Sequence, residues 1–452
     1  MYSEHGVMSF TSKQLAQYVC GELVGDENIQ CSGASIDSRN CKKGNVFFAL
    51  QGEQSDGHAF VQNAQDARCS VVVVERAIQS TIPYVLVSDA RSALRSLAAG
   101  RRAELGATVI AVTGSVGKTT VKDMLGTLLG DTAVVSAKSF NNDLGVPLTI
   151  LSAEEASFLV AEVGANDVGE MKPLSQLVSP SIAIITAIGN AHLEGFGDAE
   201  TILREKATLL EALPSSGYAI IPEEIDISPF AIAAHVITVG DSESADIQVQ
   251  TSVNSDGNAI LRIGDDTVVL SLLGEHNARN GALAVVACSV AMPEVPIGVI
   301  LQKITRVQAP DGRLSQKHVG GITFIDDSYN ANPTSMRGAL EFFANLQCGR
   351  KVLVLGDMLE LGANAQHEHD ALVERIAKID ADVVCLVGEY MLGPALSLQS
   401  TQSTHEPTAS NEALKRIASL LQKGDTVLLK GSRGVQLERI IEMKRQTTVS
   451  NH

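Results

Sequence analysis

One stretch of eight residues, 113–120, limits the possible folds of this chain more than any other part of the sequence. It follows an apolar run at 109–112 that predicts a buried parallel strand, and it precedes residues 121–129, whose apolar side chains recur at helical spacing. A strand, a glycine turn, Lys-Thr and a helix in this order are typical of a phosphate-binding loop. Glycines let backbone N–H groups turn toward a polyphosphate, and the helix N-terminus adds unpaired donors and the positive end of its dipole. The residues expected to contact phosphates are Gly114, Ser115, Val116, Gly117, Lys118, Thr119 and Thr120.

Within this loop, Lys118 is expected to bridge the terminal phosphates, and the hydroxyl of Thr119 is expected to hold a magnesium ion. The commonest form of the loop has a glycine seven positions before Thr119, where this chain has Val112, so the loop should be one residue tighter. A chance Gly-Lys-Thr in a surface turn is the alternative interpretation. The apolar strand before the loop and the amphipathic helix after it argue against that alternative.

Composition and charge restrict the classes of function. A chain of 452 residues has room for about three domains of roughly 150 residues each. Its apolar share of 45% can fill packed cores, and its low aromatic share of 4% favours aliphatic α/β packing. A net charge of −17 argues against a nucleic-acid partner, because a phosphate backbone requires a basic face.

The cysteines and the N-terminus indicate the compartment. The seven cysteines include no Cys-x-x-Cys pair, which favours free thiols in a reducing cytosol. The N-terminus has no basic segment followed by an apolar core, and no apolar run of about 18 residues occurs. We therefore expect a cytoplasmic protein with no signal peptide and no membrane insertion. Nothing in the sequence demands more than a monomer.

The pattern of strands and helices predicts an α/β protein of three domains, at 1–105, 106–310 and 311–452. The first is a small α/β domain that begins with a short helix at 12–20. In the second, strands alternate with helices, which predicts a mainly parallel sheet covered on both faces. The segment 308–312 between the last two domains has the composition of a hinge.

The later parts of the chain add two features to this architecture. Short alternating strands between 246 and 272 predict an antiparallel flap or edge on the central sheet. The last third predicts a second, Rossmann-like doubly wound sheet without a phosphate loop, and its low-complexity segment 397–410 predicts a solvated loop. The main expected strands are 109–112, 158–162, 182–186, 219–221, 322–325, 351–355, 383–387 and 426–429, and the main expected helices are 199–213, 277–292 and 297–307.

Candidate catalytic residues follow two further strands of the central sheet. Glu162 ends the apolar strand at 158–162, and His192 comes soon after the strand at 182–186. Each residue alone is ordinary, because a glutamate at a strand end is often solvated and a lone histidine is often structural. Their position at successive strand ends beside the phosphate loop favours a shared site for metal and phosphate. Lys206, on the next helix, has no local role that its surroundings in the sequence suggest.

Two asparagines open a later helix and are candidates for base recognition. Asn277 and Asn280 fall on one helix face at a spacing of three residues. An amide side chain donates and accepts hydrogen bonds at once, which suits an adenine edge. N-capping of the helix by Asn277 is an equally plausible alternative from the pattern alone.

Together these motifs resemble the Mur ligases, the ATP-dependent amino-acid ligases of peptidoglycan precursor synthesis. The resemblance extends from Asp37 to Arg433, so it covers nearly the whole chain. Besides the phosphate loop, Glu162, His192 and the His-Asn-x-x-Asn helix, it rests on the blocks Asn141–Pro147, Ala191–Gly197, Asp326–Pro333, Gly356–Gly362 and Lys430–Arg433.

The resemblance implies three domains that bind a UDP-sugar, ATP and the incoming amine, in that order along the chain. It implies that Lys118 contacts phosphates and that Thr119 and Glu162 hold one magnesium ion. His192 and Lys206 would serve a second magnesium ion. In this family the lysine matching Lys206 is usually carbamylated, which converts a cation into an anionic metal ligand. Only the resemblance gives Lys206 a role.

The resemblance also implies roles for further site residues. Asn277 and Asn280 would face adenine, and Arg313 and Asp327 would reach phosphate and ribose when the C-terminal domain closes. The residues expected near the UDP-linked substrate or the incoming amine are Ser38, Arg39, Asn142, Tyr329, Asn330, Asp357 and Arg433. Within the last group, the region Asp357–Glu360 and Arg433 could lie near either the amine or the closed nucleotide pocket.

The implied reaction joins D-alanyl-D-alanine to UDP-N-acetylmuramoyl-tripeptide at the expense of ATP. ATP would phosphorylate the terminal carboxylate of the tripeptide, and the amine would then attack the acyl phosphate. A diaminopimelate- or lysine-adding Mur ligase and a folylpolyglutamate synthase are alternatives with the same core. A nucleotide-hydrolysing switch without ligation is an alternative from another class, and the acceptor-like C-terminal third argues against it.

Overall fold

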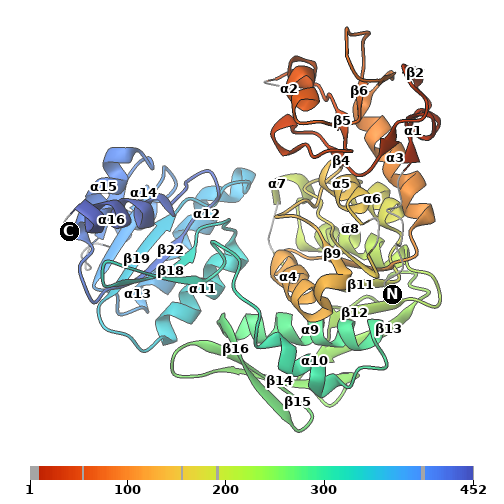
Figure 1. Ribbon diagram of the computed structural model, residues 1–452. Helices are drawn as coiled ribbons and strands as arrows, with labels where there is room; N and C mark the ends of the chain where they lie inside the picture. The colour runs from red at the N-terminus through yellow and green to blue at the C-terminus, as the bar shows by residue number, and fades with distance from the viewer. Residues whose placement is uncertain (1–9, 53–54, 154–155, 190–192, 399–402, 451–452) are drawn as a thin grey trace.

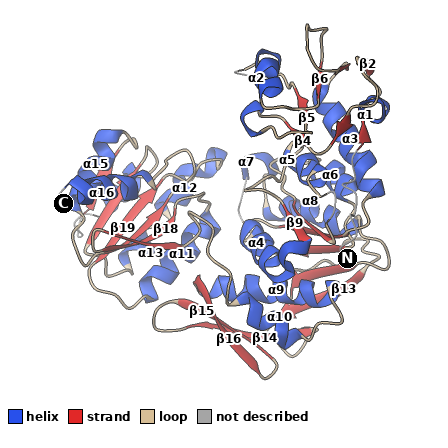
Figure 2. Ribbon diagram, in the orientation of Figure 1, coloured by secondary structure: helices blue, strands red, loops and turns tan. Residues whose placement is uncertain are grey.

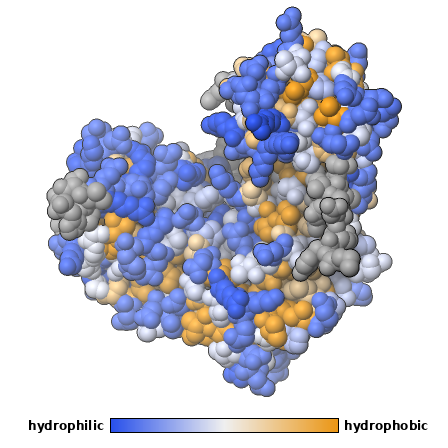
Figure 3. Space-filling model, viewed as in Figure 1, coloured by the Kyte–Doolittle hydropathy of each residue, from blue (hydrophilic) through white to orange (hydrophobic). Residues whose placement is uncertain are grey.

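The computed structural model describes residues 10–450 except 53–54, 154–155, 190–192 and 399–402. It shows an α/β protein with three lobes, which confirms the expected fold class (Figure 1). The N-terminal lobe lies at the top of this view, the central lobe below it and the C-terminal lobe at the left. A notch separates the C-terminal lobe from the N-terminal lobe on the space-filled surface (Figure 3). Within the described residues, no helix is both long and apolar enough to cross a membrane.

The N-terminal lobe contains a five-stranded sheet in the order β2-β7-β6-β5-β4 and a separate β1-β3 pair. Apolar side chains of β5 and β6 are buried on both faces, as expected for inner strands covered by helices. The strands are β1 (Phe10–Thr11), β2 (Glu22–Val24), β3 (Gln30–Cys31), β4 (Ala34–Ser35), β5 (Val46–Phe48), β6 (Val71–Val74) and β7 (Tyr84–Leu86). The helices are α1 (Ser12–Tyr18), η1 (Ser38–Asn40), η2 (Gly57–Phe60), α2 (Val61–Asp66) and α3 (Ala90–Glu104).

The central lobe is built on a nine-stranded sheet in the order β16-β15-β14-β13-β12-β11-β8-β10-β9. Its strands are β8 (Thr108–Thr113), β9 (Ala133–Val135), β10 (Phe158–Glu162), β11 (Ile182–Ile185), β12 (Tyr218–Pro222), β13 (His235–Gly240), β14 (Ile247–Val253), β15 (Asn258–Ile263) and β16 (Asp266–Leu273). Pairing is parallel from β9 to β14 and antiparallel from β14 to β16. The expected parallel sheet with an antiparallel edge is therefore confirmed.

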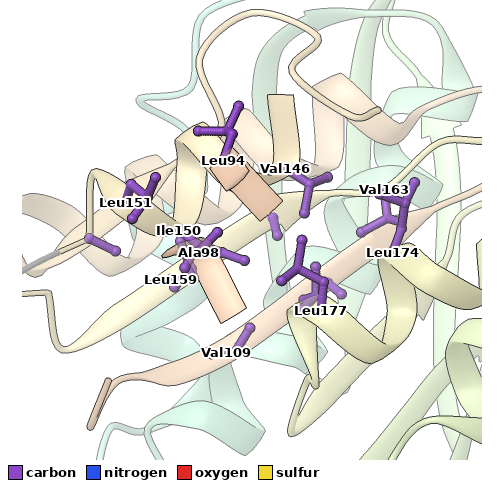
Figure 4. Close-up of a cluster of buried hydrophobic side chains, with 14 of the residues drawn as sticks. Leu94, Ala98, Val109, Val146, Ile150, Leu151, Leu159, Val163, Leu174 and Leu177 are labelled. Atoms are coloured by element: carbon purple, nitrogen blue, oxygen red, sulfur yellow. The ribbon is translucent and has the colours of Figure 1, made fainter. Parts of the chain in front are cut away.

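Helices cover both faces of this sheet (Figure 2). They are α4 (Lys118–Leu129), η3 (Gly130–Thr132), α5 (Gly145–Leu151), α6 (Met171–Val178), α7 (Leu193–Phe196), α8 (Ala199–Glu211), α9 (Glu275–Ala291) and α10 (Ile297–Ile304). Alternate residues of β8 face opposite layers: Val109 packs with the α3, α5 and α6 side chains of Figure 4, and Val112 packs with α4 and α9. Because both faces of β8 are buried, the strand has little freedom to shift, and it holds the loop after Thr113 in a fixed place.

The C-terminal lobe has a six-stranded sheet in the order β17-β18-β22-β19-β20-β21, parallel except for β17. The strands are β17 (Ser315–Val319), β18 (Ile322–Asp327), β19 (Lys351–Gly356), β20 (Val383–Val387), β21 (Ser403–Glu406) and β22 (Thr426–Lys430). The helices are α11 (Pro333–Asn345), η4 (Gly362–Asn364), α12 (Ala365–Asp370), α13 (Val373–Ala377), α14 (Leu392–Ser397), α15 (Asn411–Leu420) and α16 (Arg439–Ser450).

Strand β21 corrects the prediction of a solvated loop at 397–410. Its residues Ser403–Glu406 pair in parallel with β20 at the edge of the sheet. All four residues are half-buried and none has an aliphatic side chain. An edge strand of this kind lacks the alternation of apolar and polar residues by which a strand is recognised in a sequence.

Candidate active site

The phosphate loop lies where the sequence predicts it, between the end of β8 at Thr113 and the start of α4 at Lys118. Gly117 has a φ of 87°, in the region that favours glycine, and a Cβ there would lie 2.7 Å from Asn280 Oδ1. Val112 is buried within β8, so the loop is confined to the residues after the strand. The loop therefore leads directly into the N-terminus of α4, where the first backbone N–H groups of a helix can line an anion site.

The ammonium of Lys118 lies under this loop, where its Nζ donates to the carbonyl of Gly114 at 2.7 Å. Loss of hydration at this position lowers the pKa of Lys118, and the carboxylate of Glu162 partly offsets that effect. This hydrogen bond holds the Lys118 ammonium beside the backbone of the loop, and its contact with phosphates stays a prediction.

Thr119 and Glu162 meet as the sequence predicts. The hydroxyl of Thr119 donates to Glu162 Oε2 at 2.9 Å, and Asn141 Nδ2 donates to the other carboxylate oxygen at 2.9 Å. Both side chains are almost fully buried. They are neighbours because Glu162 and Val112 are partners in the parallel pair β10 and β8, so both strands end at the same edge.

This oxygen pair fits the requirements of Mg²⁺. Magnesium is commonly held by one or two protein oxygen ligands, with water and substrate phosphates completing the octahedron. Within the described part of the chain, no group of three or more His, Cys, Asp or Glu side chains forms a complete metal cage. The donor set at Thr119 and Glu162 therefore suits a cation that arrives with a nucleotide.

Lys206 is buried on α8, and its side chain is only 2% exposed. Burial lowers the pKa of Lys206 to about 7, the nearby ammonium of Lys118 acts in the same direction, and Glu205 opposes the shift. Its Nζ lies 5.9 Å from the centre of the Phe196 ring. His192, the other residue expected at the second metal position, lies outside the described residues.

Asn277 and Asn280 lie inside α9, and the helix is capped by Gly274, so N-capping by Asn277 is wrong. Asn277 Nδ2 donates to the carbonyl of Leu273 at 2.8 Å, and Asn280 Nδ2 donates to Asn277 Oδ1 at 3.2 Å. Both side chains line the same cavity as the phosphate loop. Their place is compatible with contact to a nucleotide base.

That cavity has a volume of about 740 Å³ and lies between the central and C-terminal lobes. The C-terminal lobe contributes Arg313, Asp327, Tyr329 and Asn330 to its lining. Arg313 Nη2 donates to the Thr119 hydroxyl at 2.9 Å, so a cation from the C-terminal lobe reaches the phosphate end of the site. The structure thus brings together residues separated by about half of the chain.

The cavity lining includes residues that the sequence predictions missed, and Lys430, Asn141 and Ser139 are three of them. Lys430 is buried, with its Nζ 2.6 Å from Asp327 Oδ2, and Asn141 orients Glu162 as described above. Ser139 forms a hydrogen bond with the Tyr329 hydroxyl at 2.6 Å. Lys430 and Asn141 belong to two of the sequence blocks on which the resemblance rests, so they could have been proposed as site residues. Nothing in the sequence indicated Ser139.

The remaining predicted substrate residues are not among the described residues that line the cavity. In the N-terminal lobe, Arg39 pairs with Asp37 next to the buried Ser38. Asn142 Oδ1 accepts the N–H of Gly145 at 2.9 Å at the start of α5. These roles stay predictions.

Asp357 and Arg433 are also engaged within the C-terminal lobe. Asp357 Oδ2 accepts the N–H of Glu389 at 2.9 Å, and burial raises the pKa of Asp357. Arg433 pairs with Glu438 at 2.8 Å. Their contact with substrate stays a prediction.

Comparisons with known proteins agree with this arrangement. Residues 30–103 match the "Mur ligase family, catalytic domain" model, residues 112–288 the "Mur ligase middle domain" model, and residues 312–433 the "Mur ligase, glutamate ligase domain" model. The UDP-N-acetylmuramoyl-tripeptide–D-alanyl-D-alanine ligase of Haemophilus influenzae is 33% identical, over 96% of this chain and 98% of that protein.

Two solved structures extend the comparison to three dimensions. A crystal structure of MurF from Acinetobacter baumannii has a TM-score of 0.85 and 33% identity, covering 97% of this chain and 99% of that one. The MurF ligase of Thermotoga maritima in complex with ADP has a TM-score of 0.76 and 26% identity, covering 93% of this chain and 99% of that one.

Proposed function

The chain belongs to the Mur ligase family, and on that premise we propose how its own side chains perform an ATP-dependent ligation. It is a ligase that uses ATP to add D-alanyl-D-alanine to UDP-N-acetylmuramoyl-tripeptide in the synthesis of peptidoglycan precursors. The observation that carries the mechanism is the meeting of Thr119, Glu162 and Arg313 at the mouth of the phosphate loop. It joins the ATP-binding lobe to the C-terminal lobe at the place where phosphate would be transferred.

The first half-reaction must overcome the poor reactivity of a carboxylate. A carboxylate oxygen of the tripeptide attacks the γ-phosphorus of ATP, the bond to the β–γ bridging oxygen breaks, and ADP leaves. Lys118 and Arg313 would reduce the repulsion between the two anions and stabilise the charge that develops on the transferred group, and their hydrogen bonds at the phosphate loop support this role. The second half-reaction is attack of the free amine of D-alanyl-D-alanine on the acyl carbon, with release of phosphate and a proton.

We assign the metal-binding roles to residues of the central lobe. Thr119 and Glu162 would hold one magnesium ion, and Lys206 with His192 would serve a second. Bound magnesium would supply charge neutralisation at the phosphates and the carboxylate. The oxygen pair at Thr119 and Glu162 and the location of Lys206 near Lys118 support these assignments.

Carbamylation of Lys206 is the second part of the proposal. A neutral amine adds to carbon dioxide to give a carbamate and a proton, so the reaction requires an amine that is not protonated. A pKa of about 7 leaves roughly half of the Lys206 amines neutral at pH 7. In carbon-13 NMR with labelled bicarbonate, we expect a carbamate signal that is missing in Lys206→Met. A signal that persists in the variant would place the carbamate elsewhere.

Each lobe receives one ligand in this proposal. Domain 1–105 binds the UDP-sugar near Ser38 and Arg39, domain 106–310 binds ATP, and domain 311–452 binds the incoming dipeptide. The chain acts as a monomer in the cytoplasm, where ATP and nucleotide-linked sugars are available. Closure of the C-terminal domain about 308–312 would keep water from the acyl phosphate.

The reaction is tested by phosphate release from ATP with the two acceptor substrates added singly and together. Release that requires both UDP-N-acetylmuramoyl-tripeptide and D-alanyl-D-alanine, with the pentapeptide product seen by mass, is the expected result. Release supported by the UDP-linked dipeptide and a single amino acid would instead indicate the preceding ligation. Release that ignores every acceptor would indicate a nucleotide switch.

A further inference from the structure

A hydrogen bond between the lobes has no part in the chemistry described above. Ser139 Oγ and the Tyr329 hydroxyl lie 2.6 Å apart, and both side chains are half-buried. Ser139 belongs to the loop 136–142 of the central lobe, and Tyr329 follows β18 in the C-terminal lobe. Within the described residues, no hydrogen bond joins either side chain to the phosphate loop. The role of this contact therefore depends on the neighbouring residues that Ser139 and Tyr329 position.

On the C-terminal side, Tyr329 holds Arg313. The guanidinium carbon of Arg313 lies 4.3 Å from the centre of the Tyr329 ring, and the Tyr329 N–H donates to the carbonyl of Gly312 at 3.0 Å. Gly312 and Leu314, the neighbours of Arg313, have φ values of 71° and 51°. Two left-handed residues and a stacked ring fix the direction of the arginine side chain, so Arg313 and Tyr329 move together.

The Asp327 carboxylate adds to this fixation, because its Oδ1 accepts the N–H of Leu314 at 3.1 Å. Its Oδ2 is paired with the buried ammonium of Lys430 at 2.6 Å. The turn that presents Arg313 is thus bonded to the ends of β18 and β22, which pair in parallel within the C-terminal sheet. From this turn the guanidinium of Arg313 extends to Thr119 of the central lobe.

On the central side, a buried lysine of α4 holds the loop 136–142. Lys122 is 2% exposed, and its Nζ donates to the carbonyls of Ser136 and Lys138 at 2.9 Å each. Lys138 itself has a φ of 50°, a conformation that is costly for a residue with a side chain and that these bonds help to maintain. Lys122 is in the same helix as Lys118 and Thr119, so the loop is attached to the phosphate-binding helix.

The same loop is attached to Glu162. The Glu162 N–H donates to Ser136 Oγ at 3.0 Å, and Asn141 Nδ2 donates to Glu162 Oε1 at 2.9 Å. Ser136 therefore fixes the backbone of Glu162, Asn141 orients its carboxylate, and Ser139 lies between these two loop residues in the chain. A displacement of this loop would therefore change both the orientation of the Glu162 carboxylate and the position of the Ser139 hydroxyl that bonds Tyr329.

We propose that Ser139 and Tyr329 are positioning residues that couple the loop 136–142 to Arg313. When the loop is in place, the hydrogen bond fixes the Tyr329 ring, and the stacked guanidinium reaches Thr119. Binding of the UDP-linked tripeptide beside this loop and binding of ATP are thereby made mutually favourable. This inference rests on the proposed function, because it requires both ligands to occupy the sites assigned above.

Coupling between two ligands is measured by binding and needs no turnover. The dissociation constant of a non-hydrolysable ATP analogue is determined by calorimetry with and without saturating UDP-N-acetylmuramoyl-tripeptide. The variants are Ser139→Ala, Tyr329→Phe, which keeps the ring over Arg313, and the double variant. Ser139→Thr keeps a hydroxyl at the loop, and Tyr218→Phe is a matched control in β12, away from the cavity lining.

We expect the tripeptide substrate to tighten analogue binding in the wild-type protein and in the control. In Ser139→Ala and Tyr329→Phe the tightening falls by about threefold to tenfold, the range of a lost neutral hydrogen bond. The double variant matches the single ones, because both remove the same contact. Ser139→Thr restores the coupling, because it keeps a hydroxyl opposite Tyr329.

Unchanged coupling in both single variants, additive losses in the double variant, or no coupling in the wild-type protein would each overturn the inference. Ligation by the wild-type protein is measured in parallel, so failure of the proposed function is recognised separately. The melting temperature of each variant is compared with that of Tyr218→Phe. If Tyr329→Phe does not fold, Ser139→Ala and its threonine counterpart decide the question alone.

Discussion

Replacing Lys206 by methionine should stabilise the ligand-free protein at neutral pH and remove part of the pH dependence of its stability. The folded-state pKa of Lys206 is about 7, against an ordinary value of 10.5. The unfolded chain therefore binds more protons than the folded one between pH 7 and 10.5, so burial of this amine makes stability rise with pH in that window.

The size of the effect follows from the two pKa values. The cost of burying the amine is about 4 kcal/mol at pH 7 and about 2 kcal/mol at pH 9, and it vanishes above the unfolded pKa. Methionine has a similar volume and carries no charge, so Lys206→Met escapes the whole cost. The difference in unfolding free energy between variant and wild type should therefore shrink by about 2 kcal/mol from pH 7 to pH 9.

The assay is urea unfolding of both proteins at several pH values in buffers free of carbon dioxide and divalent metal. Comparison at each pH cancels the contributions of all other titrating groups. Added bicarbonate should stabilise the wild-type protein alone, since a carbamate no longer carries the buried positive charge. Parallel pH profiles for the two proteins would refute the reasoning, because they would mean that Lys206 is solvated in the folded state.

Two further changes test single contacts. Glu205→Ala removes the carboxylate that accepts the buried N–H of Met171 at the start of α6 at 2.8 Å and the N–H of Gly169 at 2.9 Å, so urea unfolding should show a loss of stability. We expect about 2 kcal/mol, mainly from the buried Met171 N–H, and a loss below about 0.5 kcal/mol would contradict the capping role. Gly117→Ala forces a side chain into a left-handed residue against Asn280, so calorimetry should show weaker ATP-analogue binding. We expect about tenfold or more, whereas Gly106→Ala, where a Cβ meets open space, should bind like the wild type.

Local sequence order was sufficient to predict the nucleotide end of the site. The strand, glycine turn and helix around Lys118 are contiguous, and each carries its own pattern of apolar spacing and turn residues. Glu162 could be placed beside them because parallel strands present their carboxyl ends at one edge. The sequence could not exclude Asn277 as the N-cap of its helix, because the first residue of a helix cannot be located to better than one or two residues.

The contacts between lobes could not be predicted in the same way. Ser139 and Tyr329 are 190 residues apart, and the sequence around either residue does not indicate that the other is its partner. The polar edge strand β21 was not predicted for a related reason. It is a strand because it pairs with β20, and its own residues carry no strand pattern. A contact or a strand pairing that depends on a distant segment produces no periodic pattern of apolar residues in either segment.

Two buried lysines of the central lobe show what the structure adds to a reading of residue types. In the sequence, Lys122 and Lys206 are both ordinary helical lysines. In the structure, Lys122 Nζ is met by two carbonyls and by Asp123 at 2.8 Å, so its charge is compensated and it serves to hold a loop. Burial instead lowers the pKa of Lys206 to about 7, which makes a neutral, nucleophilic amine available. The same side chain is thus suited to structure at one position and to chemistry at the other because of what surrounds its nitrogen.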